Sequence, residues 1–354
     1  MSVLSSKLAV VPPIDQNMRV RRGARSGVMM AIAVDRTLAG RALGGCRMWQ
    51  YETAGDAIRD VERLARAMSF KAAAARLPVG GAKAVIALEH GDQPSGRWRE
   101  QILRDFAELV ECFDGRYITA QDVGTSLEDM VFLSRFTDHV AGHPIGEGGS
   151  GDPSPYTAHG VEVGIRASVR APLVGRHVVV VGLGHVGGEL ARRLHEAGAR
   201  LTVTDADPAK RALAARLQAT WVAPEEALAV QADVLAPCAL GGILDHAAVR
   251  ALQVPVVAGA ANTQLADESI AEALRRSGIL WAPDFIINAG GLIAVADELG
   301  GFDRERVERS IEGIADTLAQ VYADAARNGT NTLIAAKQLA RERLIGGLNG
   351  NHHR

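Results

Sequence analysis

The amino-acid sequence predicts a two-domain α/β protein in which a cleft separates an N-terminal α/β domain from a second domain built on a doubly wound parallel sheet. The chain has 354 residues, which is long for one domain. Residues 141–155 (AGHPIGEGGSGDPSP) hold five glycines and three prolines, so we expect no regular structure there and a domain junction. On both sides of this stretch, strand-like and helix-like segments alternate.

The N-terminal part begins this alternation with VMMAIAV at 28–34, an apolar run typical of a buried strand. Residues 53–68 carry apolar side chains at helical spacing. Ser126, followed by Asp129 three residues later, is a capping signal that opens a helix. The expected elements are strand 28–34, helix 53–68, strand 84–88, helix 97–112, strand 117–120 and helix 126–133.

The second part continues with HVVVV at 177–181, a β-branched run typical of a central parallel strand. The expected helices are 157–169, 187–197 and 209–218, and the expected strands are 200–204, 234–235, 254–258 and 278–281. A charge-rich helical stretch runs from 303 to about 343. We therefore expect domains at 1–140 and 141–325, with a helix over 326–354 packing back on the first domain.

Composition excludes several function classes. Net charge is −2, and the chain has no run of about 20 apolar residues, so we expect neither nucleic acid nor a membrane as partner. The three cysteines are far apart, which argues against disulfides and against a metal site. The N-terminus has no signal-peptide pattern. These features favour the reducing cytoplasm.

Two lysines, Lys71 and Lys83, are the first candidate site. A Gly-Gly pair, Gly80 and Gly81, precedes Lys83 and predicts a tight turn that a ligand can approach closely. A lysine whose surroundings disfavour its charge can act as a base. A second lysine nearby supplies a point charge for a carboxylate.

A dinucleotide site is the second candidate, in VVVVGLGHVGG. The pattern G-x-G-x-x-G falls between a strand and the opening of a helix, where backbone N–H groups face a pyrophosphate, as in Rossmann domains. Asp205 follows the first glycine by 23 residues and can bind a ribose diol. Its charge favours NAD over NADP, although Arg211 stands close by. The loop residues are Gly182, Gly184, His185, Val186 and Gly187.

Three further segments follow strands of the same predicted sheet, so we expect them to line the same crevice. Small residues there leave room for a nicotinamide ring, and asparagines supply donors and acceptors. The residues concerned are Cys238 and Ala239, Ala261 and Asn262, and Asn288.

Together these motifs resemble the Glu/Leu/Phe/Val amino-acid dehydrogenase family. They run in the family's order over about residues 25–345, and jointly they are specific. The matching stretches are ALGGCRMW at 42–49, PVGGAKAVI at 78–86, TAQDVGT at 119–125, GGSGDPSPYTAHGV at 148–161, GLGHVGG at 182–188, APCALGG at 236–242, GAANTQL at 259–265 and APDFIINAGG at 282–291.

The resemblance implies NAD-dependent, reversible oxidative deamination of an L-amino acid to the 2-oxo acid and ammonium. It implies that Lys71, assisted by Asn288, grips the α-carboxylate in the first domain. Lys83 is the lysine that gives up its proton near neutral pH and activates water or polarises the developing carbonyl, and Asp122 exchanges protons with the amino group. By the same resemblance, Gly44 and Gly45 approach the substrate, Thr157 and Asn262 contact the nicotinamide end of the cofactor, and the protein is a homo-oligomer.

The substrate is expected to be nonpolar. Leu43 stands where glutamate-specific relatives carry a lysine, and an aliphatic lining from Leu43, Leu292 and Val295 would leave a charged side chain unpaired. ALGG, DVGT and GDPSP resemble leucine-specific members, whereas GGCR leans toward phenylalanine. A branched-chain substrate is favoured, with phenylalanine or tryptophan as the alternative.

Three departures from the family pattern are Cys46, Ala82 and Thr263, where threonine, glycine and asparagine are usual. They put substrate preference and rate in question and remove no catalytic group. Two other functions stay open at this point. One is a catalytically silent sensor of NADH or an amino acid, against which the retained lysines and Asp122 argue. The other is a 2-hydroxy-acid dehydrogenase, which would need a histidine and arginine pair that we do not find.

Overall fold

The computed structural model describes residues 17–239 and 241–349, and divides into two compact units. The first unit comprises the chain up to Asp152, Val295–Phe302 and the chain from Arg343. The second comprises Pro153–Ala294 and Asp303–Glu342. Residues 1–16, where we expected no signal peptide, lie outside the described ranges. So do residues 350–354, which form the end of the expected C-terminal helix.

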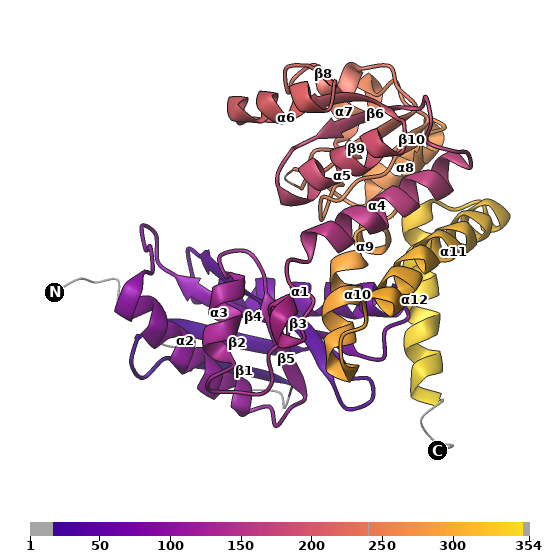
Figure 1. Ribbon diagram of the computed structural model, residues 1–354. Helices are drawn as coiled ribbons and strands as arrows, with labels where there is room; N and C mark the ends of the chain where they lie inside the picture. The colour runs from indigo at the N-terminus through magenta and orange to yellow at the C-terminus, as the bar shows by residue number, and fades with distance from the viewer. Residues whose placement is uncertain (1–16, 240, 350–354) are drawn as a thin grey trace. The chain divides into compact units, whose positions relative to one another are not determined.

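The first unit contains a mixed sheet in the order β1-β2-β4-β3-β5 (Figure 1). Strands β3, β4 and β5 are parallel, whereas β2 runs antiparallel to both β1 and β4. The strands are β1 Met18–Arg22, β2 Met29–Val34, β3 Ala42–Gln50, β4 Gly80–Leu88 and β5 Tyr117–Gln121.

Helices cover both faces of this sheet. On one face, α1 (Ala54–Ala74) packs Ala57 and Val61 against alternate residues of β2 and β4. On the other face, α2 (Gly96–Glu111) and α3 (Leu127–Leu133) bury apolar side chains against the remaining strand residues. Since side chains alternate along a strand, the α1 face receives Lys83 from β4.

The Gly-Gly pair before Lys83 corrects one expectation. Gly80 and Gly81 lie inside β4, not in a tight turn, and neither has a positive φ. Both are needed because backbone approaches closely: an added Cβ would lie 1.8 Å from the Arg36 carbonyl oxygen at Gly80 and 2.0 Å from the Ser69 nitrogen at Gly81. The second glycine therefore lets α1 dock directly on β4.

The second unit contains a six-stranded, all-parallel sheet among its described residues, in the order β11-β10-β9-β6-β7-β8. The order reverses beside β6, as in doubly wound sheets. The strands are β6 His177–Val181, β7 Arg200–Thr204, β8 Thr220–Trp221, β9 Val234–Pro237, β10 Val256–Val257 and β11 Leu280–Trp281. Its core joins Val179, Leu235 and Val257 to Ile270 and Leu274.

The other helices have the following bounds: α4 Ser154–Val169, α5 His185–Glu196, α6 Arg211–Arg216, α7 His246–Ala251, α8 Ser269–Arg276, α9 Asp284–Ile287, α10 Gly290–Asp297, α11 Arg304–Asn328 and α12 Thr332–Asn349. Short 3-10 turns are η2 Ile145–Glu147, η3 Pro208–Lys210, η4 Ala227–Ala229 and η5 Glu298–Gly300. In the described ranges, no helix is both long and apolar enough to cross a bilayer.

The expected fold class is confirmed: two α/β domains, the first with a mixed sheet and the second with a parallel one. The expected cleft between them stays a prediction. Two details were wrong. The junction 141–155 includes the turn η2, and the C-terminal helical stretch is two helices, because Gly329 ends α11 with a φ of 64°.

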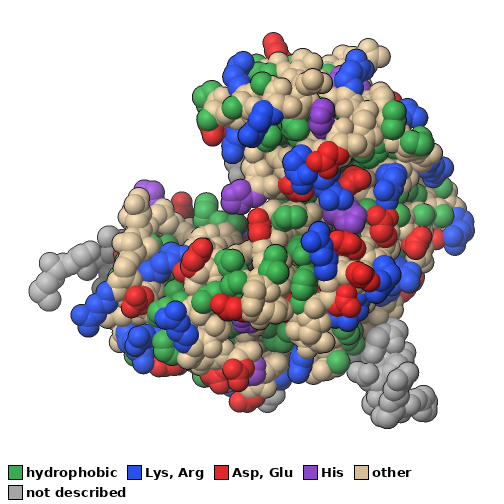
Figure 2. All heavy atoms as spheres, viewed as in Figure 1, with side chains coloured by type: hydrophobic (Ala, Val, Ile, Leu, Met, Phe, Trp, Pro, Cys, Tyr) green, Lys and Arg blue, Asp and Glu red, His purple; other side chains and the backbone are tan. Residues whose placement is uncertain are grey.

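Figure 2 shows Lys and Arg side chains interspersed with Asp and Glu on the face in view.

Candidate active site

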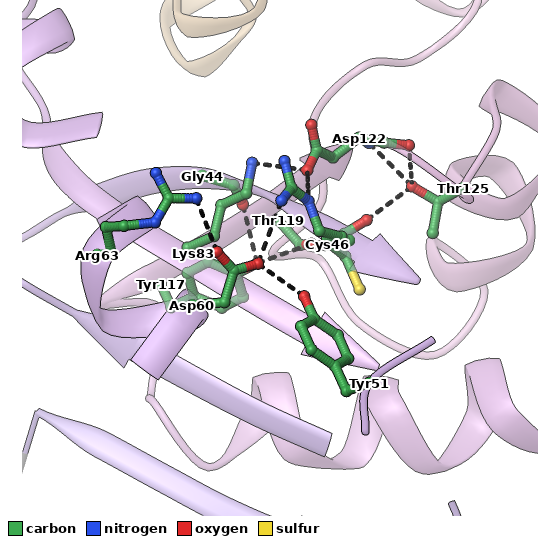
Figure 3. Close-up of polar contacts among 11 residues, drawn as sticks. Gly44, Cys46, Tyr51, Asp60, Arg63, Lys83, Tyr117, Thr119, Asp122 and Thr125 are labelled. Carbon is green, nitrogen blue, oxygen red and sulfur yellow. Dashed lines mark hydrogen bonds and ion pairs between the residues drawn. The ribbon is translucent and has the colours of Figure 1, made fainter. Parts of the chain in front are cut away.

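The Lys83 ammonium and the Asp122 carboxylate form an ion pair, with 2.8 Å between Nζ and Oδ2 (Figure 3). Lys83 lies on β4 and Asp122 follows the last residue of β5. The strand between them, β3, carries Gly45, where an added Cβ would lie 2.9 Å from the Cβ of Asp122. Gly45 thus leaves open the space across which the two side chains meet.

A short turn fixes the backbone of Asp122. Its N–H donates to Thr125 Oγ1 at 2.9 Å, and the Thr125 hydroxyl lies 2.8 Å from the Cys46 carbonyl oxygen. Gly124 has a φ of 81°, and a Cβ there would lie 2.0 Å from the Met48 carbonyl oxygen. The DVGT sequence therefore sets where the carboxylate points.

Arg47 is a third member of the site that the sequence analysis did not single out. Its Nε lies 3.3 Å from Asp122 Oδ2, and its Nη1 lies 3.1 Å from Asp60 Oδ2. Asp60 also accepts a hydrogen bond from the Tyr51 hydroxyl at 2.7 Å and pairs with Arg63. A signal was present, since Arg47 stands two residues after Gly45 on a strand and so faces the same side of the sheet.

The electrostatics of the site keep Asp122 ionised. Burial raises the pKa of Asp122, but the charges of Lys83 and Arg47 outweigh it, and the pKa lies below its ordinary value. Burial also raises the pKa of the Cys46 thiol well above its ordinary value, so the thiol remains neutral. The Lys83 side chain is only 7% exposed, so its ion pair with Asp122 is largely withdrawn from water.

Lys71 stands in the last turn of α1 and is half-buried. Ser69, two residues before it, is the point where α1 touches Gly81 of β4. This docking brings the turn that carries Lys71 down on the strand that carries Lys83. Leu43 is 1% exposed on β3, and by alternation it shares the α1 face with Lys83.

Gly44 is required by the sheet itself. A Cβ at this position would lie 1.6 Å from the Ala82 carbonyl oxygen, and its own carbonyl accepts a bond from the buried Tyr117 hydroxyl. Its expected approach to a substrate stays a prediction.

In the second unit, the glycine loop has the geometry of a dinucleotide cradle. Gly182 has a φ of 99°, and a Cβ on Gly187 would lie 2.0 Å from the Gly182 carbonyl oxygen. Gly184 faces open space and precedes α5, whose first turn has no side-chain cap. N–H groups without a side-chain cap, next to a glycine whose Cβ position has nothing within 4 Å, fit a pyrophosphate. His185 and Val186 form the first residues of α5.

Asp205 lies just after β7, as expected. Its carboxylate accepts hydrogen bonds from the backbone N–H groups of Leu183 at 2.5 Å and Asp207 at 2.8 Å. The carboxylate is thereby fixed beside the glycine loop, where a ribose diol could donate to its remaining lone pairs.

The two asparagines expected at the strand ends are in contact. Asn288 Nδ2 donates to Asn262 Oδ1 at 2.7 Å and to the Ala260 carbonyl oxygen at 3.0 Å. Asn288 Oδ1 is buried and has no hydrogen-bond partner among the described residues. In this orientation the unpaired atom, Oδ1, can only accept a hydrogen bond, whereas a substrate carboxylate would need a hydrogen-bond donor.

The other expected contact residues fall into two groups. Near the glycine loop, a Cβ on Gly182 would meet Ala239, and one on Gly187 would meet Cys238, whose pKa is raised to about 12 by burial. Elsewhere in the second unit, Ala261 is buried, Thr157 Oγ1 lies 3.1 Å from the Pro153 carbonyl oxygen, and Leu292 is half-buried. Val295, 6% exposed, belongs to the first unit.

Comparison with known proteins decides the family. The profile of the "Glu/Leu/Phe/Val dehydrogenase, dimerisation domain" matches residues 16–139, and that of "Glutamate/Leucine/Phenylalanine/Valine dehydrogenase" matches residues 206–346. A leucine dehydrogenase of Thermoactinomyces intermedius is 43% identical over 90% of this chain and 88% of its own. The chain belongs to the Glu/Leu/Phe/Val dehydrogenase family.

Other members of the Glu/Leu/Phe/Val dehydrogenase family carry different substrate names. A phenylalanine dehydrogenase of Bacillus thermotolerans is 38% identical over 92% of this chain and 87% of its own. The crystal structure of L-tryptophan dehydrogenase from Nostoc punctiforme superposes with a TM-score of 0.81 at 35% identity, covering 94% of this chain and 96% of that one. The protein is therefore an amino-acid dehydrogenase, an oxidoreductase acting on a CH–NH2 group, in the group of leucine, phenylalanine and tryptophan dehydrogenases. This confirms the expected family and enzyme class.

Proposed function

We propose that this protein catalyses the NAD-dependent, reversible oxidative deamination of a nonpolar L-amino acid, with branched-chain aliphatic substrates favoured. The observation that carries the proposal is the ion pair between Lys83 and Asp122, which is largely buried within the first unit. Burial of an ammonium is costly, and a binding protein without chemistry has no need of it. A catalytically silent sensor is therefore the weaker reading.

The proposed roles of the residues in this reaction are as follows. Lys71 holds the α-carboxylate as a point charge. Bound NAD would accept the hydride from Cα. The ionised Asp122 first takes a proton from the ammonium group of the substrate, which leaves a neutral amine before the hydride departs. Lys83, acting in its neutral form, then takes a proton from the water that attacks Cα. Asp122 returns its proton to the amino group, which leaves as ammonium with the proton of the new hydroxyl as the 2-oxo acid forms. Asn288 takes no step in this scheme, because its Nδ2 already donates to Asn262 Oδ1 and to the Ala260 carbonyl oxygen.

The choice of NAD follows from charge. The family uses NAD(P), and the carboxylate of Asp205, held by two backbone N–H groups, would repel a 2′-phosphate. Arg211, which could have offset this repulsion, lies with its guanidinium 4.8 Å from the centre of the Trp221 ring. We expect kcat/KM with NAD to exceed that with NADP by about 10²-fold or more, in line with one unpaired charge at the site.

A branched-chain substrate is proposed because Leu43, which lies on the same face of the first sheet as Lys83, is apolar and almost fully buried. A charged side chain there would be unpaired. An aromatic substrate, phenylalanine or tryptophan, is the alternative, and relatives of both names are similar to this chain.

A panel of L-amino acids with NAD at alkaline pH tests the proposal through the appearance of NADH absorbance. We expect the largest kcat/KM for leucine, valine or isoleucine, and no turnover of glutamate. Faster turnover of phenylalanine or tryptophan would move the assignment to the aromatic alternative. Absence of turnover with every nonpolar amino acid would reject the proposal and favour the sensor.

Two further expectations, on assembly and on location, belong to the same proposal. The matched dimerisation domain favours a homo-oligomer of this chain, which light scattering would reveal as a mass of at least twice that of one chain. The three cysteines are free thiols, which is compatible with the cytoplasmic location expected from their spacing.

A further inference from the structure

Arg47 connects two carboxylates that lie on different elements of the first unit. On one side its Nε contacts Asp122, after β5, at 3.3 Å. On the other its Nη1 contacts Asp60, on α1, at 3.1 Å. The Arg47 side chain is 24% exposed, and those of Asp60 and Asp122 are 17% and 23% exposed. The planar guanidinium fork suits such a bridge, which a lysine could not make in the same way.

Asp60 is itself held from two further sides. The Tyr51 hydroxyl donates to Oδ2 at 2.7 Å, and Arg63 contacts Oδ1 at 2.8 Å (Figure 3). The pKa of Asp60 is lowered, because these hydrogen bonds and the charge of Arg47 outweigh its burial. Asp60 is therefore a fixed anion, and it gives Arg47 a firm anchor on the helix that covers the sheet.

Both cations that reach Asp122 contact the same oxygen. Lys83 Nζ lies 2.8 Å and Arg47 Nε 3.3 Å from Oδ2. Among the residues drawn in Figure 3, both contacts to the Asp122 carboxylate reach this oxygen. The backbone N–H of Val123 also donates to the carboxylate. The carboxylate cannot rotate without giving up two charge-assisted contacts, so a substrate amino group would approach the other oxygen.

The groups that face Asp122 come from every neighbouring strand. Lys83 on β4 and Arg47 on β3 are the cations, and Asp60 of α1 lies one contact beyond Arg47. Burial, and to a lesser degree the charge of Asp122, raises the pKa of the Cys46 thiol on β3 and of the Tyr117 phenol on β5, so both remain neutral. Arg47 is therefore one of two charges that bear directly on this carboxylate among the described residues of the first unit.

We propose that Arg47 is a positioning residue of the deamination reaction: anchored on Asp60, it holds one oxygen of Asp122 beside Lys83 and leaves the other to exchange a proton with the amino group of the substrate. The inference rests on the proposed function, because it names what orients the proton-exchanging carboxylate of that reaction. Arg47 touches neither substrate nor cofactor in this account and acts only through Asp122.

The pH profile of kcat/KM for the best amino-acid substrate provides the test, using the full-length chain with Arg47→Gln. Removing a neighbouring cation favours a proton on either Asp122 or Lys83, so the acid limb moves to higher pH in both cases. We expect a shift of about 1 pH unit. Because Asp122 also loses its orientation, kcat falls by about 10- to 100-fold, while KM changes little.

Two further variants separate charge, geometry and mere stability. Arg47→Lys retains the positive charge but not the fork, so the acid limb should return toward that of the parent while kcat stays lowered. Arg59→Gln removes a matched arginine from α1 whose partner is Asp56 and whose side chain is 71% exposed. It should leave both the limb and kcat within about two-fold of the parent. An unmoved limb in Arg47→Gln, or an equal shift in Arg59→Gln, would overturn the inference.

An NMR titration of the aspartate carboxyl carbons in the full-length chain gives a readout that needs no turnover, with the Asp122 signal assigned through Asp122→Asn. Arg47→Gln should move the Asp122 midpoint to higher pH by about 1 unit. If this shift occurs but the parent turns over no amino acid, the proposed function fails and the contact stands. If the parent is active and the midpoint does not move, the inference fails alone.

Discussion

At the scale of single residues, the site depends on a lysine with almost no access to water. Lys83 is 5% exposed, and burying an ammonium without a partner is costly. Asp122 is that partner at 2.8 Å, and Arg47 shares the carboxylate. The three side chains reach each other because Gly45 on the intervening strand has none.

Replacing the lysine should abolish the chemistry and spare the fold. Lys83→Ala removes the proposed proton acceptor, while Asp122 keeps Arg47 as a partner. We expect kcat to fall by about 10³-fold, within the range of a lost general base. NAD affinity, measured by fluorescence titration, should stay within about two-fold, since the glycine loop belongs to the other unit. A variant with near-normal kcat would show that Lys83 has another role.

A second prediction concerns Thr263, one of the departures from the family pattern. Its φ is 52°, a conformation that a β-branched residue tolerates poorly and asparagine tolerates well. Thr263→Asn should therefore raise the free energy of unfolding by about 1 kcal/mol. Urea unfolding of the full-length chain measures this difference. Thr263→Val, which keeps the branched Cβ, should bring no such gain, and stabilisation by both variants would count against backbone strain as the cause.

At the scale of elements, the loop between β1 and β2 is attached to α2 through a buried carboxylate. The Asp105 side chain is fully buried and accepts hydrogen bonds from Ser26 N at 2.8 Å, Ser26 Oγ at 2.7 Å and Arg25 Nη1 at 2.9 Å. Burial raises the pKa of Asp105, but the bonds from Ser26 and Arg25 outweigh it and the pKa is lowered. This carboxylate contributes stability above the pKa it has when unfolded, about 3.9, and the contribution is lost as pH falls through the folded value.

Asp105→Asn should lower the free energy of unfolding by about 2–3 kcal/mol at neutral pH, because a charged acceptor of several bonds is lost in a buried position. Below about pH 4 the difference from the parent should begin to shrink, because the unfolded parent then takes up a proton on Asp105, and it should disappear once the pH falls below the lowered pKa of the folded state. Denaturant unfolding at both pH values measures it. Glu100→Gln, an exposed change on the same helix, is the control. A difference that stays constant or grows in acid would contradict this account.

The sequence predicted those elements whose own residues carry the signal. Strands β2, β5, β6 and β7 and helices α2, α3 and α5 lie within three residues of the expected bounds. The sequence did not predict β3 as a strand, because Gly44 and Gly45 weaken the local preference for a strand, and only neighbouring backbone explains them. Strand β1 (MRVRR) was not predicted either, because its arginines hide the pattern of a strand. A charged strand is tolerated here because β1 lies at the edge of the sheet and, among the described strands, pairs only with β2.

The site was predictable to a similar extent. Residue type and spacing pointed to Lys83 and the glycine loop, whereas Asp122 was identified only through the family motif TAQDVGT at 119–125. Arg47 was not named, because its importance lies in contacts with Asp60 and Asp122, and the register of three strands brings these together. The orientation of the Asn288 amide likewise depends on Asn262 and on a carbonyl that is far from it in sequence. The local sequence around a residue does not show which distant residues it will contact.

At the scale of the whole molecule, the chain passes between the two units four times within its described ranges. Glu298 lies in the segment Val295–Phe302, which belongs to the first unit. It binds the end of the stretch of that unit that runs up to Asp152. Its carboxylate accepts from Gly142 N at 2.9 Å, His143 N at 3.2 Å and Ser150 N at 2.7 Å. With a side chain 5% exposed, it leaves these N–H groups paired inside the protein.

A fragment of residues 1–152 should therefore be far less stable than the same residues in the intact chain. It lacks Glu298 and also Arg343, which donates to the Ala74 carbonyl oxygen at the end of α1. Losing both leaves backbone groups unpaired, at a cost of about 1–3 kcal/mol for each such buried group. Circular dichroism during heating should show a broad transition at lower temperature than in the full chain. A sharp transition at the same temperature would show that the later segments add nothing.

The same threading sets an order of events on the ribosome. The N-terminal unit is begun first but finished last, since its final pieces lie beyond residue 342, whereas nearly the whole of the second unit emerges in between. At a translation rate of about 5–20 residues per second, the nascent first unit waits on the order of 10–40 s for its closing segments. During that interval the backbone groups that Glu298 and Arg343 pair in the finished protein have no such partner, so a prematurely terminated chain would leave the N–H groups of Gly142, His143 and Ser150 open.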